Sequence, residues 1–394
     1  MENNFTINRE LGVAMTDTFS TLYPELNHWI LNSQENWDES RDGNVKETLN
    51  FKTIITNPYR RAWGGYNRNP NVFFLLAEAM WIFIGRKDVR FLTLFNKKME
   101  AFSDDGVVFH APYGFRLRHW GVRSEDKYNE ENLHAAQGYD QVEDAIRLLY
   151  NNPNTRQVVM SIWNTDLDLG TKTKDIPCND MVMLKVRNGK LITTIQNRSN
   201  DLHLGLPTNV FQFSFLTEMM AGCLGIELGT QTHNSQSLHI YDWCPSVENM
   251  EKAYADNSGN ELYNVGAEER KVDFNFAHDV PTNRLREIDM IISILLINLE
   301  NISRGKDESK DDIKMIEQFS QYLHKVYQLL KVYLLYKAGI AENKDAIKPE
   351  AEKALELINE ITKGEWTNWD MAVLARNFFV KRAGSFNHEY LGTL

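Results

Sequence analysis

The dipeptide Asn188-Gly189 constrains the fold of this 394-residue chain more than any other feature. It stands between two apolar runs, residues 181–186 (MVMLKV) and 190–196 (KLITTIQ). Asn-Gly favours a two-residue type I′ turn, because both central positions of that turn need a positive φ. The pattern therefore predicts an antiparallel β-hairpin that pairs Arg187 with Lys190.

The predicted hairpin also places a reactive group. If its register continues without irregularity, Cys178 lies opposite Ser199 and next to Arg198. A guanidinium beside a thiol stabilises the thiolate, which is the nucleophilic form of cysteine. We therefore expect an activated cysteine where the two strands end.

The charge balance limits the ligands that the chain can bind. It has 43 Lys and Arg against 54 Asp and Glu, a net charge of −11. This balance excludes a duplex-DNA binder that relies on a broad basic surface. An anionic ligand needs a local group of arginines, and the loop-like segment 57–70 carries Arg60, Arg61 and Arg68. These arginines are either phosphate contacts or ordinary surface residues.

The cysteines and the apolar segments indicate the compartment. The three cysteines, Cys178, Cys223 and Cys244, have no metal-ligand spacing, so we expect no metal site and a reducing, intracellular environment. Residues 1–12 lack the apolar core of a signal peptide. The most apolar run, Met290–Leu299, is shorter than the ~20 residues that span a bilayer. We expect a soluble, cytoplasmic protein that does not bind a membrane.

Two very apolar segments predict buried helices. Residues 73–85 are apolar on nearly every face and contain Glu78. The carboxylate of Glu78 either pairs with a buried cation or serves proton transfer, since an unpaired buried charge is very costly. Residues 210–224 form the second helix, in which Cys223 is expected to pack without reacting.

Other segments predict shorter elements and a change of character near residue 280. A strand-like alternation is expected from Tyr113, and an exposed, charged insertion over residues 121–139. An amphipathic helix is predicted over 139–156, with strands over 157–163 and 236–243. Further along, helical spacing predicts helices over 284–302, 311–335, 349–362 and 369–382.

Six motifs, in order over residues of about 73–245, resemble the thymidylate synthase family. They are EAMWIFIG, PYG, NTRQVVMSIWN, IPC, NRSNDLHLGLPTN and LHIY. The resemblance implies the α/β (α+β) fold of that family, with a mixed or antiparallel sheet packed by helices. We accordingly predict a catalytic domain over residues 1–280 and an all-helical extension over residues 281–394, whose role the sequence does not define.

The resemblance also implies a reaction and a set of nucleotide contacts. The thiolate of Cys178 adds to carbon 6 of a pyrimidine nucleotide, and carbon 5 then attacks the methylene of 5,10-methylenetetrahydrofolate. Arg198 and Ser199 hold the phosphate, and Arg156 reaches the phosphate in the partner subunit of a homodimer. The base edge contacts Asn209, and the 3′-hydroxyl is bound by His239 and Tyr241.

The folate contacts and the proton transfers are implied in the same way. Asp201 binds the pterin, and Glu78, Trp81 and Gly205 also belong to the folate site. Glu78 and Tyr113 manage proton transfer through ordered water.

Departures from the family pattern change the expected product. The residue after the nucleophile is Asn179 where the family usually has histidine, Gln157 replaces a second arginine, and Ser237-Leu238 precedes the ribose histidine, as in phage nucleotide hydroxymethylases. No tryptophan lies between Gly85 and Trp120 to shield the methylene intermediate, and Phe102 is the nearest bulky candidate. Water entering the site at this step gives a 5-hydroxymethyl product and tetrahydrofolate.

The amide of Asn209 favours uracil, because cytosine-specific relatives carry an acid at this position. The sequence therefore predicts a dUMP hydroxymethylase. A thymidylate synthase that makes dTMP and dihydrofolate, a dCMP hydroxymethylase and a nucleotide-binding regulator without catalysis remain alternatives. A cysteine hydrolase is disfavoured, because Asn179 stands where an adjacent histidine base is needed.

Overall fold

A computed structural model describes residues 5–33, 35–40, 43–64, 70–122, 138–244 and 266–384. The chain divides into two compact units. The first unit comprises Met1–Arg68, Asp140–Lys172 and Ile176–Gly266, and the second comprises Asn69–Tyr139, Thr173–Asp175 and Ala267–Leu394. The insertion predicted over residues 121–139 lies mostly outside the described residues.

The predicted hairpin is confirmed. Strand β6 (Asn179–Arg187) pairs with β7 (Lys190–Asn197), and Arg187 lies opposite Lys190. Asn188 and Gly189 have φ values of 52° and 70°, as a type I′ turn requires.

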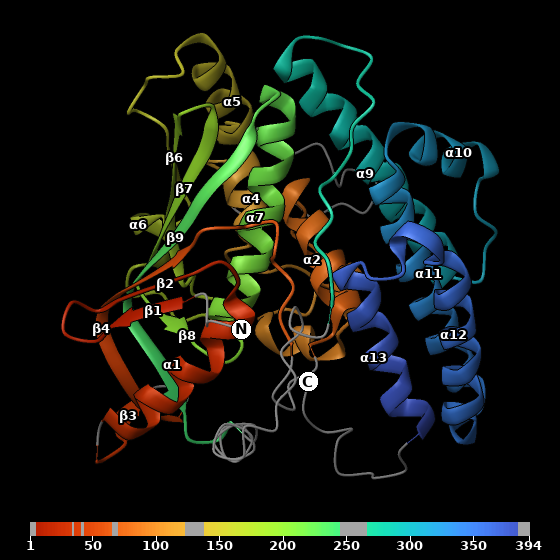
Figure 1. Ribbon diagram of the computed structural model, residues 1–394, viewed down its shortest axis with the longest axis horizontal. Helices are drawn as coiled ribbons and strands as arrows, with labels where there is room; N and C mark the ends of the chain where they lie inside the picture. The colour runs from red at the N-terminus through yellow and green to blue at the C-terminus, as the bar shows by residue number, and fades with distance from the viewer. Residues whose placement is uncertain are drawn as a thin grey trace. The chain divides into compact units, whose positions relative to one another are not determined.

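A mixed sheet forms the centre of the first unit (Figure 1). Its strands follow the order β1-β2-β4-β9-β7-β6-β5, with β3 beside β4 and β8 beside β9. Three of the pairings are parallel (β2 with β4, β7 with β9, and β8 with β9) and the others are antiparallel, so the predicted mixed sheet is confirmed. The remaining strands are β1 (Phe5–Asn8), β2 (Val13–Thr16), β3 (Asp38–Ser40), β4 (Gly43–Ile55), β5 (Val159–Ser161), β8 (Asn200–Asp201) and β9 (Glu227–Tyr241).

Helices α1 (Phe19–Ser33) and α7 (Gly205–Leu224) share one core with the sheet. Phe19 and Leu22 of α1, Val210 of α7, and Phe51 and Ile240 of the sheet are all fully buried in this core. Helix α7 is the apolar helix predicted over residues 210–224, and it begins earlier, at Gly205. The unit also contains α5 (Gln141–Asn151), which lies within the predicted amphipathic helix, and α6 (Thr165–Asp168).

The opposite face of the sheet is more exposed in the first unit. On β2, Ala14 is buried whereas the next residue, Met15, is 43% exposed. On β6, Val182 and Leu184 are buried whereas Met181 and Met183 are only half-buried. Val159 of β5 is 48% exposed. Because side chains alternate between the faces of a strand, these residues share the less covered face.

The second unit is helical, and α2 (Val72–Phe83) lies at its centre. This is the predicted apolar helix, and it contacts α11 (Gln321–Glu342) and α13 (Asp370–Gly384) from the C-terminal part of the chain. The ring of Phe73 stacks on Tyr333 with 4.7 Å between centroids, and the hydroxyl of Tyr333 donates to the carbonyl oxygen of Phe95 over 3.0 Å. The C-terminal helices therefore pack onto α2, and the domain boundary at residue 280 stays a prediction.

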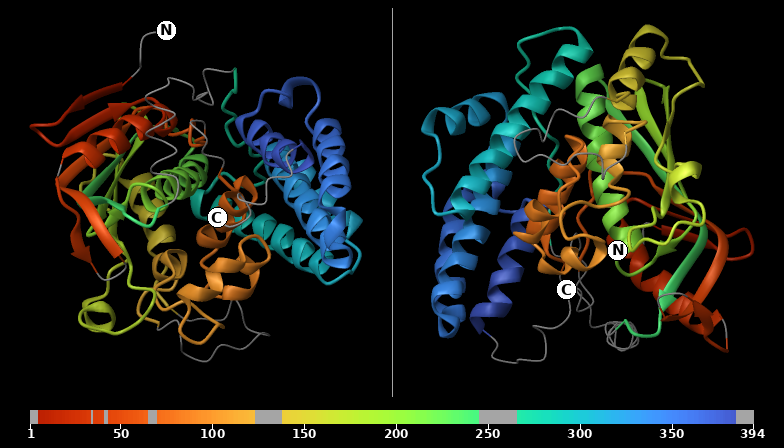
Figure 2. Two further views of the ribbon diagram at one scale, coloured as in Figure 1. Left: turned by 90° about the horizontal axis from the view of Figure 1, so that it is seen from below. Right: turned by 180° about the vertical axis from the view of Figure 1, so that it is seen from behind.

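Helix α12 (Ile347–Ile361) lies against both α11 and α13 (Figure 2). The remaining helices of the second unit are α3 (Val89–Thr93), η1 (Lys97–Phe102), α4 (Tyr113–Arg118), α9 (Pro281–Ser303), α10 (Lys310–Phe319), η3 (Lys344–Ala346) and η4 (Gly364–Trp366). No helix in the described parts of the chain is both long enough and apolar enough to cross a membrane.

The prediction of a single helix over residues 311–335 is wrong, because the helix is interrupted at Ser320. Ser320 has extended dihedral angles, φ −157° and ψ 120°, and its hydroxyl accepts from the N–H of Leu323 over 3.1 Å. The carboxylate of Asp273 accepts from the N–H groups of Gln321 and Tyr322, both over 2.9 Å. These contacts cap a new helix, which apolar spacing alone does not reveal.

The strand-like alternation expected from Tyr113 is also wrong, because this segment is helix α4. A β-carbon on Gly114 would lie 1.9 Å from the carbonyl oxygen of Ile82, so α4 approaches α2 at a residue without a side chain. Arg118 is charged but buried, and it forms an ion pair of 2.6 Å with Asp289.

Candidate active site

A β-bulge sets the position of Cys178 in the first unit. The register of the hairpin holds as far as Met181, which lies opposite Gln196, and then shifts so that Asn179 lies opposite Asn197. Asp180 is the extra residue of this bulge. A bulge re-aims the neighbouring side chains, and bulges are frequent beside active sites.

Because of the bulge, the prediction that Cys178 lies opposite Ser199 is wrong by one residue. The backbone N–H of Arg198 donates to the carbonyl oxygen of Cys178 over 3.1 Å. Cys178 is half-buried, and its Sγ lies 3.9 Å from the carbonyl oxygen of Ile176. The expected neighbour relation between Cys178 and Arg198 is confirmed along the backbone.

The side chain of Arg198 is held in place by the segment that precedes the cysteine. Its Nε donates to the carbonyl oxygen of Pro177 over 2.8 Å, and its Nη2 donates to that of Ile176 over 3.3 Å. The guanidinium also lies 5.7 Å from the centroid of the Trp163 ring. A guanidinium fixed in this way keeps donors for an anionic group.

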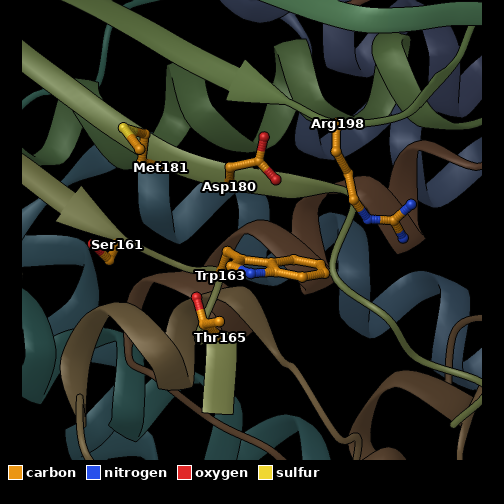
Figure 3. A pocket seen from close by; sticks show the side chains of 6 residues that line it. All are labelled: Ser161, Trp163, Thr165, Asp180, Met181 and Arg198. Atoms are coloured by element: carbon orange, nitrogen blue, oxygen red, sulfur yellow. The ribbon is translucent and has the colours of Figure 1, made fainter. Parts of the chain in front are cut away.

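Arg198 lines a pocket of about 430 Å³ on the first unit (Figure 3). Its lining residues are Ser161, Trp163, Thr165, Asp180, Met181 and Arg198. Burial raises the pKa of Asp180 from its ordinary 3.8 to about 6, although the charge of Arg198 acts in the opposite direction. Sequence reasoning missed Asp180 and Trp163, because their convergence depends on the bulge.

The amides near the nucleophile form a connected chain. Asn179 is fully buried, and its Nδ2 donates to Oδ1 of Asn209 over 3.2 Å. Nδ2 of Asn209 donates to Oδ1 of Asn200 over 3.3 Å. The structure thus links Asn179 directly to Asn209, which the resemblance assigns to the base.

The predicted ribose residues lie together at the end of β9. The rings of His239 and Tyr241 meet edge to face, with 5.0 Å between centroids. The hydroxyl of Ser237 donates to the carboxylate of Glu47 on β4 and lies 3.2 Å from Nδ1 of His239. A hydroxyl that donates to a carboxylate has only lone pairs left for the histidine, so Nδ1 carries the proton.

The same contacts leave Nε2 of His239 as a hydrogen-bond acceptor. Burial lowers the pKa of His239, while the charges of Asp201 and Glu47 act in the opposite direction, so the ring is neutral at neutral pH. A neutral ring with an accepting Nε2 suits a hydroxyl donor. Sequence reasoning missed Glu47, because it comes from an N-terminal strand outside the six motifs.

Three further predicted residues lie on the segment that joins β7 to α7 and includes the loop before α7. Asp201 accepts from the N–H groups of His203 and Leu204 over 2.9 Å and 2.8 Å, so its carboxylate orders this loop. Gly205 is the first residue of α7, and a β-carbon there would lie 3.4 Å from Oδ1 of Asn200. Ser199 is half-buried beside Arg198. The ligand contacts expected of these residues stay predictions.

The arginines proposed for phosphate binding differ in exposure. Arg156 is exposed, and Arg60 pairs with Asp17 over 2.8 Å. Arg61 is 1% exposed and pairs with the buried Glu218, so it is a core residue rather than a phosphate contact. Arg68 lies outside the described residues.

The second unit holds the remaining predicted residues. Glu78 on α2 and Tyr113 at the start of α4 are half-buried. Trp81 is buried, and its Nε1 donates to the carbonyl oxygen of Asp88 over 3.1 Å. Phe102, at the end of η1, is 50% exposed. The roles expected of these residues stay predictions.

The fold and the first-unit site define an α/β protein with a cysteine and an arginine paired at the open end of a bulged hairpin. A family model described as thymidylate synthase matches residues 68–291, which is more than half of the chain. The chain belongs to the thymidylate synthase family.

Several known proteins are similar to this chain. The deoxyuridylate hydroxymethyltransferase of Bacillus phage SP01 is 41% identical over 222 residues, which cover 55% of this chain and 56% of that protein. The enzyme of the same name from Pseudomonas phage M6 is 34% identical over 53% of this chain and 55% of its own length. A third, from Delftia phage PhiW-14, is 27% identical over 66% of this chain and 70% of its own length. The chain thus spans about half the length of the first two relatives.

Proposed function

We propose that this protein is a folate-dependent transferase that converts dUMP to 5-hydroxymethyl-dUMP. The observation that carries the proposal is the pairing of Cys178 with Arg198 at the bulged end of the hairpin. This backbone pairing joins the residue that carries the thiol to an arginine whose guanidinium is fixed by the preceding carbonyl groups, and a fixed guanidinium suits a nucleotide phosphate. The phage relatives named deoxyuridylate hydroxymethyltransferases support the same assignment.

The reaction begins with the thiolate of Cys178. A bond forms between Sγ and carbon 6 of the uracil, and the electron pair of the ring double bond moves to carbon 5 as an enolate. Carbon 5 attacks the methylene of 5,10-methylenetetrahydrofolate and then loses its proton. Tetrahydrofolate departs and leaves an exocyclic methylene on the ring.

Water completes the reaction in this proposal. Its oxygen adds to the exocyclic methylene and gives up one proton to the solvent, the double bond returns to the ring, and the thiolate of Cys178 is released. A thymidylate synthase would instead deliver hydride from tetrahydrofolate. The sequence between Gly85 and Trp120 has no tryptophan to shield the methylene, and Phe102 is half exposed, which supports the water route.

We propose nucleotide contacts that the first-unit geometry supports. Arg198, with Ser199 beside it, binds the phosphate. The 3′-hydroxyl donates to Nε2 of His239, close to Tyr241. Asn209 binds the uracil edge. We propose that Asp201, Gly205, Trp81 and Glu78 serve folate, and that Glu78 and Tyr113 move protons through water.

The working form is proposed to be a homodimer in which Arg156 enters the partner's site. Arg156 is exposed, and it lies just before β5, the strand at one edge of the sheet. Mixing Arg156→Ala with Cys178→Ser tests this, because a mixed dimer has one site with neither defect. Recovery of activity on mixing is expected, and inactivity of verified mixed dimers would contradict the shared site.

Because dUMP and folate are cytoplasmic metabolites, we propose that the enzyme works in the cytoplasm of the producing cell, which is the host cell if the chain is phage-encoded.

The direct experiment incubates the protein with dUMP and methylenetetrahydrofolate and identifies the nucleotide by mass. A hydroxymethyl gain is expected. A methyl gain with dihydrofolate absorbance would indicate a thymidylate synthase, and turnover of dCMP alone would indicate the cytidylate enzyme. Cys178→Ser should lose turnover while keeping dUMP binding, with Cys223→Ser as the control. Binding without turnover in the unmodified protein would indicate a regulator.

A further inference from the structure

A one-way chain of side-chain amides runs through the base end of the site. Nδ2 of Asn197 donates to Oδ1 of Asn179, and Nδ2 of Asn179 donates to Oδ1 of Asn209 over 3.2 Å. Asn209 donates to Asn200 over 3.3 Å, and Asn200 donates to Oγ of Ser235 over 3.0 Å. Every amide in the chain donates in the same direction.

The chain is sealed from solvent, so its members constrain one another. The four asparagines of this amide chain and Ser235 are each 0–8% exposed. Turning one inner amide alone would set oxygen against oxygen on one side and N–H against N–H on the other. Each mismatch leaves a buried polar group without its hydrogen bond, which is costly. The orientation of Asn209 is therefore coupled to that of Asn179.

The two ends of the amide chain are compatible with either direction of hydrogen-bond donation. The hydroxyl of Ser235 can donate or accept, since it has both a proton and lone pairs. Oδ1 of Asn197 has no hydrogen-bond partner among the described residues, so it can accept from Asn179 if the direction reverses. An inner residue that can only accept would therefore set the direction for its neighbours.

The direction of the chain decides which base edge Asn209 matches. After its two chain bonds, Asn209 keeps one lone pair on Oδ1 and one N–H on Nδ2. Uracil presents a donor at N3 and an acceptor at O4, whereas cytosine presents an acceptor and a donor at the corresponding positions. A fixed Asn209 can match one base, and the reversed Asn209 matches the other.

We infer that Asn179, the residue directly after the nucleophile, is a positioning residue that fixes Asn209 for uracil and against cytosine. This inference rests on the proposed function. It gives Asn179 a role through Asn209 rather than through the nucleotide itself. The observation that carries it is the donated hydrogen bond from Asn179 to Asn209 inside a chain with a single direction.

Asn179→Asp is the decisive variant, because an ionised aspartate accepts from both neighbours. Asn197 continues to donate to it, while Asn209 and Asn200 must turn. The ratio of kcat/KM for dUMP to kcat/KM for dCMP is expected to fall about tenfold or more, as two hydrogen bonds to the base are exchanged. The added charge affects both anionic nucleotides alike, so the ratio isolates the orientation.

Asn179→Leu covers the case in which the aspartate stays protonated. Leucine cannot donate, so Asn209 loses its fixed orientation and the dUMP to dCMP ratio is expected to fall toward one. Asn188→Asp, at the far turn of the hairpin, adds the same charge and should leave the ratio unchanged. Unchanged ratios in both Asn179 variants, in protein that still turns over dUMP, would overturn the inference. Failure of the unmodified protein to turn over dUMP would instead contradict the proposed function.

Discussion

The backbone N–H of Arg198 and the carbonyl oxygen of Cys178 form a hydrogen bond of 3.1 Å, which closes the hairpin beyond its bulge. The same arginine side chain donates to the carbonyl oxygens of Ile176 and Pro177. The thiol-bearing segment and the cation are therefore ordered together. One substitution at Arg198 should disturb both nucleotide binding and thiol reactivity.

Arg198→Ala is expected to weaken dUMP binding about 10- to 100-fold, because charge-assisted hydrogen bonds to the phosphate are lost. Removal of the cation should also make the pKa of the Cys178 thiol higher than in the unmodified protein. Isothermal titration calorimetry and the pH dependence of alkylation measure the two effects. Arg187→Ala, on the same hairpin, is the control. A thiol that titrates identically in both variants would contradict the predicted activation.

Glu47→Ala tests the hydrogen bonds that orient His239. Without the carboxylate, the hydroxyl of Ser237 can donate to the histidine, so Nε2 is no longer fixed as an acceptor. We expect dUMP to bind up to about tenfold more weakly. Binding of 2′,3′-dideoxyuridine monophosphate, which lacks the 3′-hydroxyl, should not change. Equal losses for the two nucleotides would show that Glu47 acts elsewhere, and Glu39→Ala on β3 is the control.

Asp180→Asn is expected to change the pH dependence of stability. The pKa of Asp180 is raised from its ordinary value of 3.8 to about 6 in the folded protein, because burial favours the protonated carboxyl. The stability that this protonated carboxyl contributes is complete below pH 3.8 and is lost as the pH rises through about 6. The asparagine variant lacks this loss. Its free energy of unfolding relative to the unmodified protein should rise between about pH 4 and 7. Urea titrations across this range measure it, and profiles parallel to those of the exposed control Asp166→Asn would exclude the effect.

Arg61→Met tests whether Arg61 stabilises the core or contacts the phosphate. Removing one partner of its buried pair with Glu218 should lower the free energy of unfolding by about 3–5 kcal/mol. The dissociation constant for dUMP, measured where the variant is folded, should remain as in the unmodified protein. The double variant with Glu218→Leu should recover most of the stability. A loss of dUMP affinity without a loss of stability would instead indicate that Arg61 contacts the phosphate.

The features that the sequence predicted correctly are those with local causes. The turn at Asn188-Gly189 depends on two residues whose backbone tolerates positive φ. Helices α2 and α7 follow from continuous apolar segments. The order of motifs that resemble the thymidylate synthase family agrees with the family match over residues 68–291.

The features that sequence reasoning missed depend on contacts between distant segments. The bulge at Asp180 shifts Cys178 by one position, and a register extended from the turn cannot reveal it. Glu47 meets His239 only because β4 pairs with β9, strands far apart in the sequence. The break at Ser320 depends on Asp273, which caps the new helix from an earlier segment.

The fate of the methylene intermediate is the central claim, and turnover in water enriched in heavy oxygen tests it most directly. The protein would be incubated with dUMP and methylenetetrahydrofolate in that water, and the product analysed by mass. We predict a 5-hydroxymethyl nucleotide that carries the heavy oxygen, with tetrahydrofolate as the second product. A methyl nucleotide without the label, formed together with dihydrofolate, would contradict the account.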